Sequence, residues 1–132
     1  RGLHMRPRDT MLRLHRFRTE EKRRQVADIE GMINDFMRKY DDLDAAVKFE
    51  ESRNGVSDPT HFNYSLQAKA ARARRDNLMK SIAELKDQLT DARAALDEAE
   101  QELRRAELLI EKEGAAAVAV AAQVMAAPQH VR

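Results

Sequence analysis

The sequence has few of the residues from which a globular core is built. Only 5% of its 132 residues are aromatic, and it contains no cysteine and no tryptophan. Proline occurs only at positions 7, 59 and 128 and glycine only at 2, 31, 55 and 114, so two long stretches of helix formers flank one break. The 42% of hydrophobic residues are rich in alanine and predict a narrow buried stripe. This composition excludes a compact α/β or β enzyme domain.

Long hydrophobic runs are also missing. No stretch approaches the roughly 20 apolar residues of a membrane span, and the start lacks the apolar segment of a signal peptide. We therefore expect a cytoplasmic protein, and the absence of cysteine agrees with this. Residues 1–4, Arg1-Gly2-Leu3-His4 before Met5, look like a cloning remnant and play no part in the fold prediction.

Charge is abundant and unevenly distributed. Charged residues make up 36% of the chain, whose net charge is +1. Residues 1–25 contain nine basic and three acidic residues, a balance of +6, which leaves about −5 for the remainder. Residues 97–113 contain seven acidic and three basic residues. The start of the chain is thus basic, and a distant segment is acidic.

Residues 9–52 predict a first coiled-coil helix. Their apolar residues alternate in steps of three and four, which keeps them on one side of an α-helix. These residues are Val26, Ile33, Tyr40 and Val47 at heptad position a, and Ile29, Phe36 and Leu43 at d. Toward the N-terminus the same frame reaches Lys22, Thr19, His15 and Leu12, so the stripe becomes polar there. Gly31 costs this helix about 1 kcal/mol relative to alanine, for which a crowded helix contact is the expected reason.

Residues 65–113 repeat more strictly and predict a second coiled-coil helix. One column of the repeat contains Ile82, Leu89, Leu96, Leu103 and Ile110 at a, and the other contains Leu78, Leu85, Ala92, Ala99 and Ala106 at d. Because the repeat is 3.5 residues per turn, any supercoil should be left-handed.

The break at residues 53–64 predicts a bend. Gly55 permits a turn, Ser57 or Asp58 can cap a helix, and Pro59 suits a first helical position. We therefore predict an all-α fold, an antiparallel coiled-coil hairpin over residues 5–113, with Tyr40 near Leu78 and the basic segment beside residues 97–113. The Ala-rich residues 114–132 are expected to form a flexible tail, either frayed helix or disordered.

Catalytic motifs are missing from the sequence. It has no Gly-rich phosphate loop, no His-Glu-x-x-His motif and no metal-ligand spacing, and its four histidines are isolated from one another. The carboxylates are expected on solvated helix faces without a pocket to shift their pKa. We therefore expect a non-enzyme that uses no metal and no cofactor.

Three features are candidates for binding. The first is a basic arm, which either pairs with residues 97–113 or forms a partner surface: Arg13, Arg16, Arg18, Lys22, Arg23 and Arg24. The second is residues 62–66, where two of the six aromatic residues lie beside the bend and either pack locally or anchor a partner. The third is the basic run of residues 69–75 before the leucine heptads, which resembles a basic-zipper DNA reader.

The zipper interpretation is an alternative with a weakness. Parallel zippers favour leucine at d and β-branched residues at a, whereas alanine fills Ala92, Ala99 and Ala106 at d here. A zipper would also leave the stripe of residues 26–47 without a partner. We therefore expect no nucleic-acid partner.

Three segments resemble the FliJ family of the flagellar type III export apparatus, in its alphaproteobacterial form. They are Met5-Arg6-Pro7-Arg8-Asp9 with Leu12-Arg13-Leu14-His15-Arg16-Phe17, then Glu21-Lys22-Arg23-Arg24-Gln25-Val26 with Ile29-Glu30 and Met32-Ile33, and Gly55-Val56-Ser57-Asp58-Pro59-Thr60-His61-Phe62-Asn63-Tyr64. With Arg75-Asp76-Asn77-Leu78 and Glu84-Leu85-Lys86, the resemblance extends over about residues 5–113. The Ala-rich end lies outside it.

The resemblance implies a cytoplasmic coiled-coil stalk that acts in flagellum biogenesis, motility and protein transport. Such a stalk sits in the pore of the hexameric export ATPase, promotes its assembly, and reaches the cytoplasmic domain of the export-gate membrane protein. It is peripheral at the inner face of the cell membrane through these partners only. On this basis the basic arm is the candidate ATPase contact, and the candidate gate contacts are Tyr40, Leu43, Phe62, Tyr64 and Leu66. An alternative role is the escort and recycling of export chaperones, and the oligomeric state of the isolated hairpin is left open.

Overall fold

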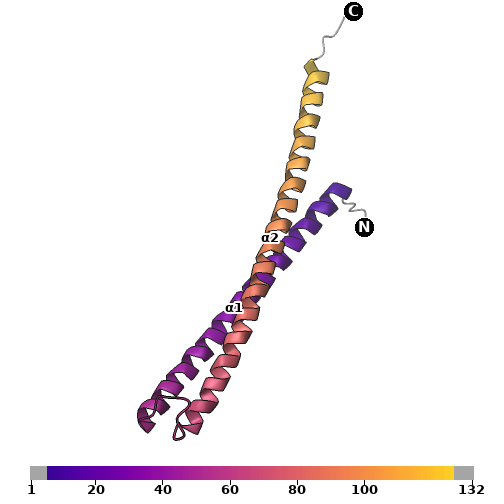
Figure 1. The fold of residues 1–132 in the computed structure, drawn as a ribbon. Coiled ribbons are helices and arrows are strands. Elements are labelled where there is room, and N and C mark those ends of the chain that lie inside the picture. Colours follow the sequence, from indigo (N-terminus) through magenta and orange to yellow (C-terminus); the bar gives the residue numbers. More distant parts are fainter. Residues whose placement is uncertain (1–5, 127–132) are drawn as a thin grey trace, which may run out of the picture. The chain divides into compact units, whose positions relative to one another are not determined.

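The computed structural model describes residues 6–126, which form two helices joined by a loop (Figure 1). Helix α1 is Pro7–Asn54, helix α2 is Leu66–Ala126, and residues 55–65 connect them. The described residues contain no strand. The helices pack against each other in opposite directions, which confirms the predicted all-α helical hairpin. The suspected cloning remnant, residues 1–4, and the last part of the predicted tail, residues 127–132, lie outside the described residues.

The chain divides into two compact units, and each unit contains a piece of both helices. The loop unit is residues 24–94, and the terminal unit is formed by residues up to 23 together with those from 95 onward. In both units the side chains buried between α1 and α2 are mainly at positions that the heptad frame assigns to a and d.

The loop unit has an apolar seam. Val47 is 2% exposed, Ile33 7% and Leu85 6%, and the alanine at 68 is completely buried, so the frame of α2 extends upstream of the predicted leucine columns. The other seam residues are half-buried: Val26, Ile29, Phe36, Tyr40, Leu43, Leu78, Ile82, Leu89 and Ala92. Close packing of alanine and branched residues is what holds this helix pair together.

The terminal unit has a more polar seam. Thr19 is completely buried at position a, and its hydroxyl donates a hydrogen bond to the carbonyl oxygen of His15 at 2.8 Å. The same hydroxyl lies 3.4 Å from the carbonyl oxygen of Ala99 on α2. The remaining seam residues here are half-buried: Leu12, His15, Lys22, Leu96, Leu103, Ala106 and Ile110. This unit therefore buries less apolar surface per turn than the loop unit.

Three local signals shape the loop. Gly55 has a left-handed φ of 76°, and its N–H donates to the carbonyl oxygen of Glu51 at 2.8 Å, which ends α1. The Asp58 carboxylate accepts hydrogen bonds from the backbone N–H and the hydroxyl of Thr60, and these bonds lower the pKa of Asp58. The cap of α2 is Ser65, whose hydroxyl accepts from the N–H of Ala68 at 3.2 Å. The expectation that Ser57 or Asp58 caps this helix was wrong, because Asp58 instead closes a turn.

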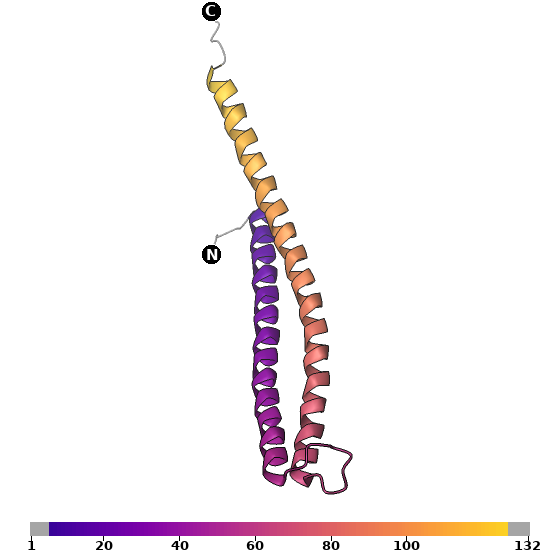
Figure 2. The same ribbon diagram turned by 60° about the vertical axis from the view of Figure 1, so that its left-hand side comes forward.

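Helix α2 is longer than expected. It continues through residues 114–126, which corrects the expectation that it ends near residue 113 and that this segment is a frayed or disordered tail. Alanine has the highest helix propensity, so the run of alanines after Gly114 outweighs one glycine. Within the terminal unit, this end of α2 continues past the first turn of α1 (Figure 2).

Gly31 also differs from the expectation. A methyl group built at its Cα would meet nothing within 4 Å, so a crowded helix contact is not the reason for this glycine. Gly31 is at heptad position f, on the side of α1 opposite the a and d residues, and it is exposed to solvent.

Candidate interaction surfaces

The candidate functional sites are exposed surfaces on the helices and the loop, because side chains there do not contribute to the packing of the hairpin. Among residues 6–126, no group of three or more His, Asp or Glu side chains is arranged to hold a metal ion. Neither helix, over the same residues, contains a stretch that is both long and apolar enough to cross a lipid bilayer.

Most of the basic arm is engaged within the chain. Arg16 Nη2 lies 3.9 Å from Glu107 Oε2 on α2. Arg23 pairs with Glu20 at 2.5 Å and with Glu100 of α2 at 3.4 Å. Lys22 is half-buried at a seam position, and Arg24 also has an interaction. Internal pairing with residues 97–113, one of the two alternatives, therefore accounts for the charge of Arg16 and Arg23.

The hydrogen bond that Arg23 donates to the Glu20 carboxylate is the main reason that the pKa of the Arg23 guanidinium is raised. The hydrogen bond with Glu100 raises it further, and partial burial has an opposing effect. The two carboxylates connect Arg23 to both helices, since Glu20 is on α1 and Glu100 is on α2.

Two exposed members of the arm have no such partner. Arg13 and Arg18 are exposed, and neither forms an ion pair with a described residue. They flank Phe17, which is 57% exposed, and Leu14, which is 38% exposed. Leu14, Phe17 and Arg18 are three and four residues apart and so lie on one face of α1, away from the seam. We call Arg13, Leu14, Phe17 and Arg18 the outer patch.

The loop presents an aromatic side chain to solvent. Phe62 is 94% exposed, and its ring stacks on that of His61 with centroids 4.7 Å apart. Leu66, the first residue of α2, is 81% exposed. The side-chain amide of Asn54 donates to the carbonyl oxygen of Asn63 at 2.7 Å, which ties the loop to the end of α1.

Tyr64 does not belong to this exposed surface. It is 9% exposed, and its hydroxyl donates to Glu51 Oε2 at 2.6 Å. Burial, followed by the nearby Glu51 carboxylate, raises the pKa of Tyr64. The structure therefore separates Tyr64, which anchors the loop, from Phe62 and Leu66, which face outward.

The other two predicted gate contacts lie in the seam of the loop unit. Leu43 is half-buried, and Tyr40 lines a groove of about 360 Å³ between the helices. Met37 and Met79, which are 46% and 54% exposed, form much of this groove. Its other lining residues are Asp41, Ile82, Ala83 and Lys86.

This groove lies one heptad from an ion pair between the helices of the loop unit. Position e of α1 is paired with position e of α2 in the Glu30–Arg93 ion pair, whose atoms are 2.9 Å apart. Met37 occupies the next e position of α1, and Met79 occupies an e position of α2. The a and d positions alone do not reveal either methionine. An apolar residue at position e, which is charged at Glu30 and Arg93, could have indicated this groove from the sequence.

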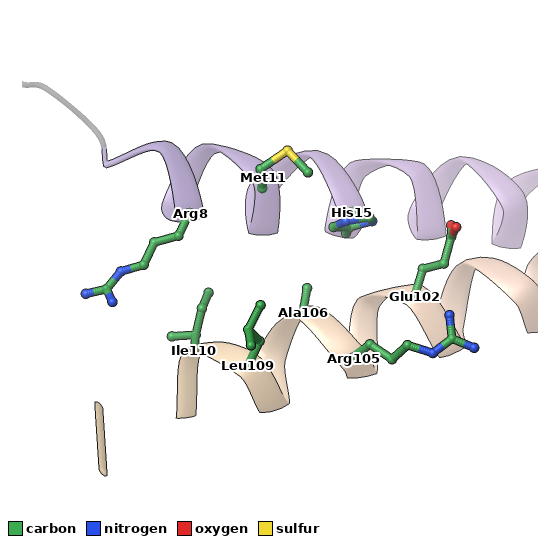
Figure 3. A pocket seen from close by; sticks show the side chains of 8 residues that line it. All are labelled: Arg8, Met11, His15, Glu102, Arg105, Ala106, Leu109 and Ile110. Atoms are coloured by element: carbon green, nitrogen blue, oxygen red, sulfur yellow. The ribbon is translucent and has the colours of Figure 1, made fainter. Parts of the chain in front are cut away.

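A second groove lies in the terminal unit, with a volume of about 390 Å³ (Figure 3). Ala106, Leu109 and Ile110 contribute its wall from α2, and Met11 and His15 contribute from α1. Arg8 closes one end and forms an ion pair with Glu113 at 2.9 Å. The a and d columns do not reveal this groove either, since Met11 and Leu109 are at position g.

The basic run of residues 69–75 lies partly in the seam. Arg75 occupies an a position, and its guanidinium lies 3.0 Å from the Asp44 carboxylate of α1. The leucine columns after this run pack on α1 of the same chain. An in-chain partner for these columns leaves the zipper interpretation without a specific observation in its favour.

Comparisons with protein-family models, with curated proteins and with solved structures give no match to this chain.

Proposed function

We propose that this chain is a non-enzymatic coiled-coil stalk of the flagellar type III protein export apparatus, which links the hexameric export ATPase to the export gate. The observation that supports this most directly is the in-chain antiparallel seam, which leaves two unlike surfaces free. The terminal unit has the basic and aromatic outer patch, and the loop unit has the exposed Phe62. The resemblance of residues 5–113 to FliJ proteins supplies the identity of the partners.

The outer patch is the proposed ATPase contact. Arg13 and Arg18 are exposed arm residues that form no ion pair with a described carboxylate, so their charge is available to an acidic surface. Phe17 between them supplies an aromatic anchor of the kind that dominates protein interfaces. Arg16 and Arg23 are assigned a lesser role, since binding a partner would first have to break their pairs with α2.

Charge reversal tests this contact. Arg13→Glu combined with Arg18→Glu should weaken binding to the purified export ATPase by at least about tenfold, because two favourable charge contacts become repulsive. The matched control is Arg38→Glu with Arg74→Glu, which makes the same change in net charge on exposed residues of the loop unit. Equal affinity for both double variants would contradict the assignment of this surface.

Phe62 is the proposed centre of the gate contact. Phe62 is almost fully exposed and so contributes little to the packing of the hairpin. The hydrogen bonds of Asn54 and Tyr64 fix the loop on which it lies. Phe62→Ala should reduce affinity for the cytoplasmic domain of the gate protein about tenfold or more in a calorimetric titration. Phe49→Ala is the control, because Phe49 is 63% exposed in the same unit but lies on α1. Unchanged binding by Phe62→Ala would remove Phe62 from the gate contact.

The groove lined by Met37 and Met79 favours a second candidate function, the escort of export chaperones. Methionine side chains adapt to different apolar partners, which suits a surface that receives several chaperones in turn. Met37→Glu with Met79→Glu should then abolish chaperone binding and leave ATPase binding intact. Chaperone binding that survives this double substitution would exclude the groove.

A further inference from the structure

The last 13 described residues of α2, 114–126, form an overhang beyond the first turn of α1 (Figure 2). The ion pair of Arg8 with Glu113 marks where the paired region stops. All residues of the overhang are exposed and none is charged, and Val118, Val120, Val124 and Met125 are between 59% and 86% exposed. A helix that is apolar on every side is normally buried. No described residue provides that cover.

The overhang continues the seam of the terminal unit. Ala117 and Val124 fall at position a and Val120 at d, in the same frame that turns Ala106 and Ile110 toward α1. The surface that α1 covers therefore extends onto the overhang without a change of face. Val118 and Met125 lie on a different side of the helix.

The groove of Figure 3 is continuous with this surface. Leu109 and Ile110 form its wall only a few residues before the overhang, and Leu109 is 61% exposed. Met11 on α1 is 53% exposed across the groove. The terminal unit thus offers an apolar helix and, beside it, an apolar groove that no described residue fills.

The absence of charge on the overhang indicates which kind of partner covers it. A charged partner face would lose its hydration against the overhang and gain no ion pair in return, so the partner must itself be uncharged. In this chain, with 36% charged residues, the overhang is the longest uncharged stretch among the described residues. We propose that the overhang is an interface to a second copy of the chain, in which two overhangs pair antiparallel about a two-fold axis. Each tip then reaches toward the groove of the other copy, so one symmetric contact covers both apolar features.

The expected contact is small. Each overhang is about 20 Å long at 1.5 Å per residue, and two of them seated against two grooves bury on the order of 1,000 Å², at the lower limit for specific interfaces. The dimer should therefore be reversible, with a dissociation constant of roughly micromolar order.

Sedimentation of the full chain from 1 to 500 μM is the test. The wild type should shift with concentration from the 15.1 kDa monomer to a dimer. Val120→Glu with Val124→Glu should stay monomeric with unchanged helicity by circular dichroism, because both residues are on an exposed helix surface. Val118→Glu with Met125→Glu, equal in charge but on another side, should still dimerise.

Cysteine cross-linking tests the orientation, and the cysteine-free sequence makes it specific. Ala117→Cys, near the two-fold axis, should form an intermolecular disulfide on oxidation, whereas Val124→Cys alone should not. Cross-linking by both single variants would indicate parallel pairing and contradict the proposal.

Three results would overturn the dimer. They are a monomeric wild type at 500 μM, equal loss of dimer in both glutamate double variants, and a dimer that persists when residues 114–132 are deleted. Flotation of the wild type with phosphatidylcholine vesicles, together with absence of the dimer, would identify a lipid surface as the occupant instead.

Discussion

Glycine has opposite consequences at two positions of this fold. At Gly31 the backbone is helical and the space beside it is open, so the glycine only adds flexibility to the unfolded chain and exposes helix backbone. At Gly55 the φ of 76° is one that other residues adopt at a cost, so this glycine is what lets α1 end and the loop begin.

Gly31→Ala should therefore stabilise the protein by about 1 kcal/mol, and Gly55→Ala should destabilise it by about the same amount. Urea unfolding followed by circular dichroism would measure both, with equal slopes expected for the two variants. A Gly31→Ala variant that is less stable than the wild type would contradict the open surroundings of this residue.

The ionisation of Asp44 is tied to the packing of the two helices in the loop unit, because Asp44 pairs with Arg75 of α2. The hydrogen bond from Lys48 and then that from Arg75 lower its pKa. The carboxylate therefore loses its proton more readily in the folded chain than in the unfolded chain. Its stabilising effect is complete above the ordinary pKa of an aspartate, about 4, and is lost as the pH falls through the lower folded value.

Asp44→Asn should lower the thermal midpoint at pH 7 and flatten the decline in stability between pH 4 and pH 2. Asp42→Asn is the control, because Asp42 is exposed and forms no ion pair among the described residues. Thermal melts at half-unit pH intervals would decide the question. Parallel curves for wild type and Asp44→Asn would show that this carboxylate does not contribute to acid sensitivity.

At the scale of the elements, the two ends of the loop are fixed by different devices. Gly55 terminates α1, whereas Ser65 begins α2 by accepting a hydrogen bond from the N–H of Ala68. Ser65→Ala should cost about 1 kcal/mol of stability, and Ser65→Asp should retain most of it. The comparison of both variants by urea unfolding checks this, and a Ser65→Ala variant as stable as the wild type would dismiss the cap.

The seam of the two helices was predictable from the sequence, and their ends were not. Alternating steps of three and four place Ile33, Val47 and Leu85 on the apolar side of their helices, and this is the side that is buried. The heptad pattern contains no information about where a helix stops once its partner ends, so the continuation of α2 to Ala126 depended on alanine propensity alone. The burial of Tyr64 could not be foreseen either, because it results from a hydrogen bond to Glu51 across the loop.

The candidate surfaces were only partly predictable for a similar reason. A run of basic residues is visible in a sequence, but which of them are paired depends on the register of the helices. Arg16 and Arg23 face glutamates on α2, whereas Arg13 and Arg18, a few residues away, face outward. Of the six residues predicted to contact the ATPase, the register of the helices therefore singles out Arg13 and Arg18 as the proposed contact.

At the scale of the whole molecule, the two units should differ in local stability. The seam of the terminal unit includes His15, Thr19 and Lys22, and its cross-helix ion pairs are exposed, so salt screens them. The seam of the loop unit is apolar apart from Arg75. Hydrogen exchange by mass spectrometry should show faster exchange in residues 8–22 than in residues 26–47, with the difference growing between 50 mM and 500 mM salt. Uniform protection along α1 would contradict this description.

The proposed stalk function is tested most directly by adding the purified chain to its export ATPase while ring assembly and ATP turnover are measured together. Ring formation can be followed by mass photometry and turnover by phosphate release. Both should rise and saturate near one chain per six ATPase subunits. Arg13→Glu with Arg18→Glu should abolish the rise, and Arg38→Glu with Arg74→Glu should preserve it. If the wild-type chain changes neither ring assembly nor turnover at a tenfold excess over rings, the stalk function is wrong.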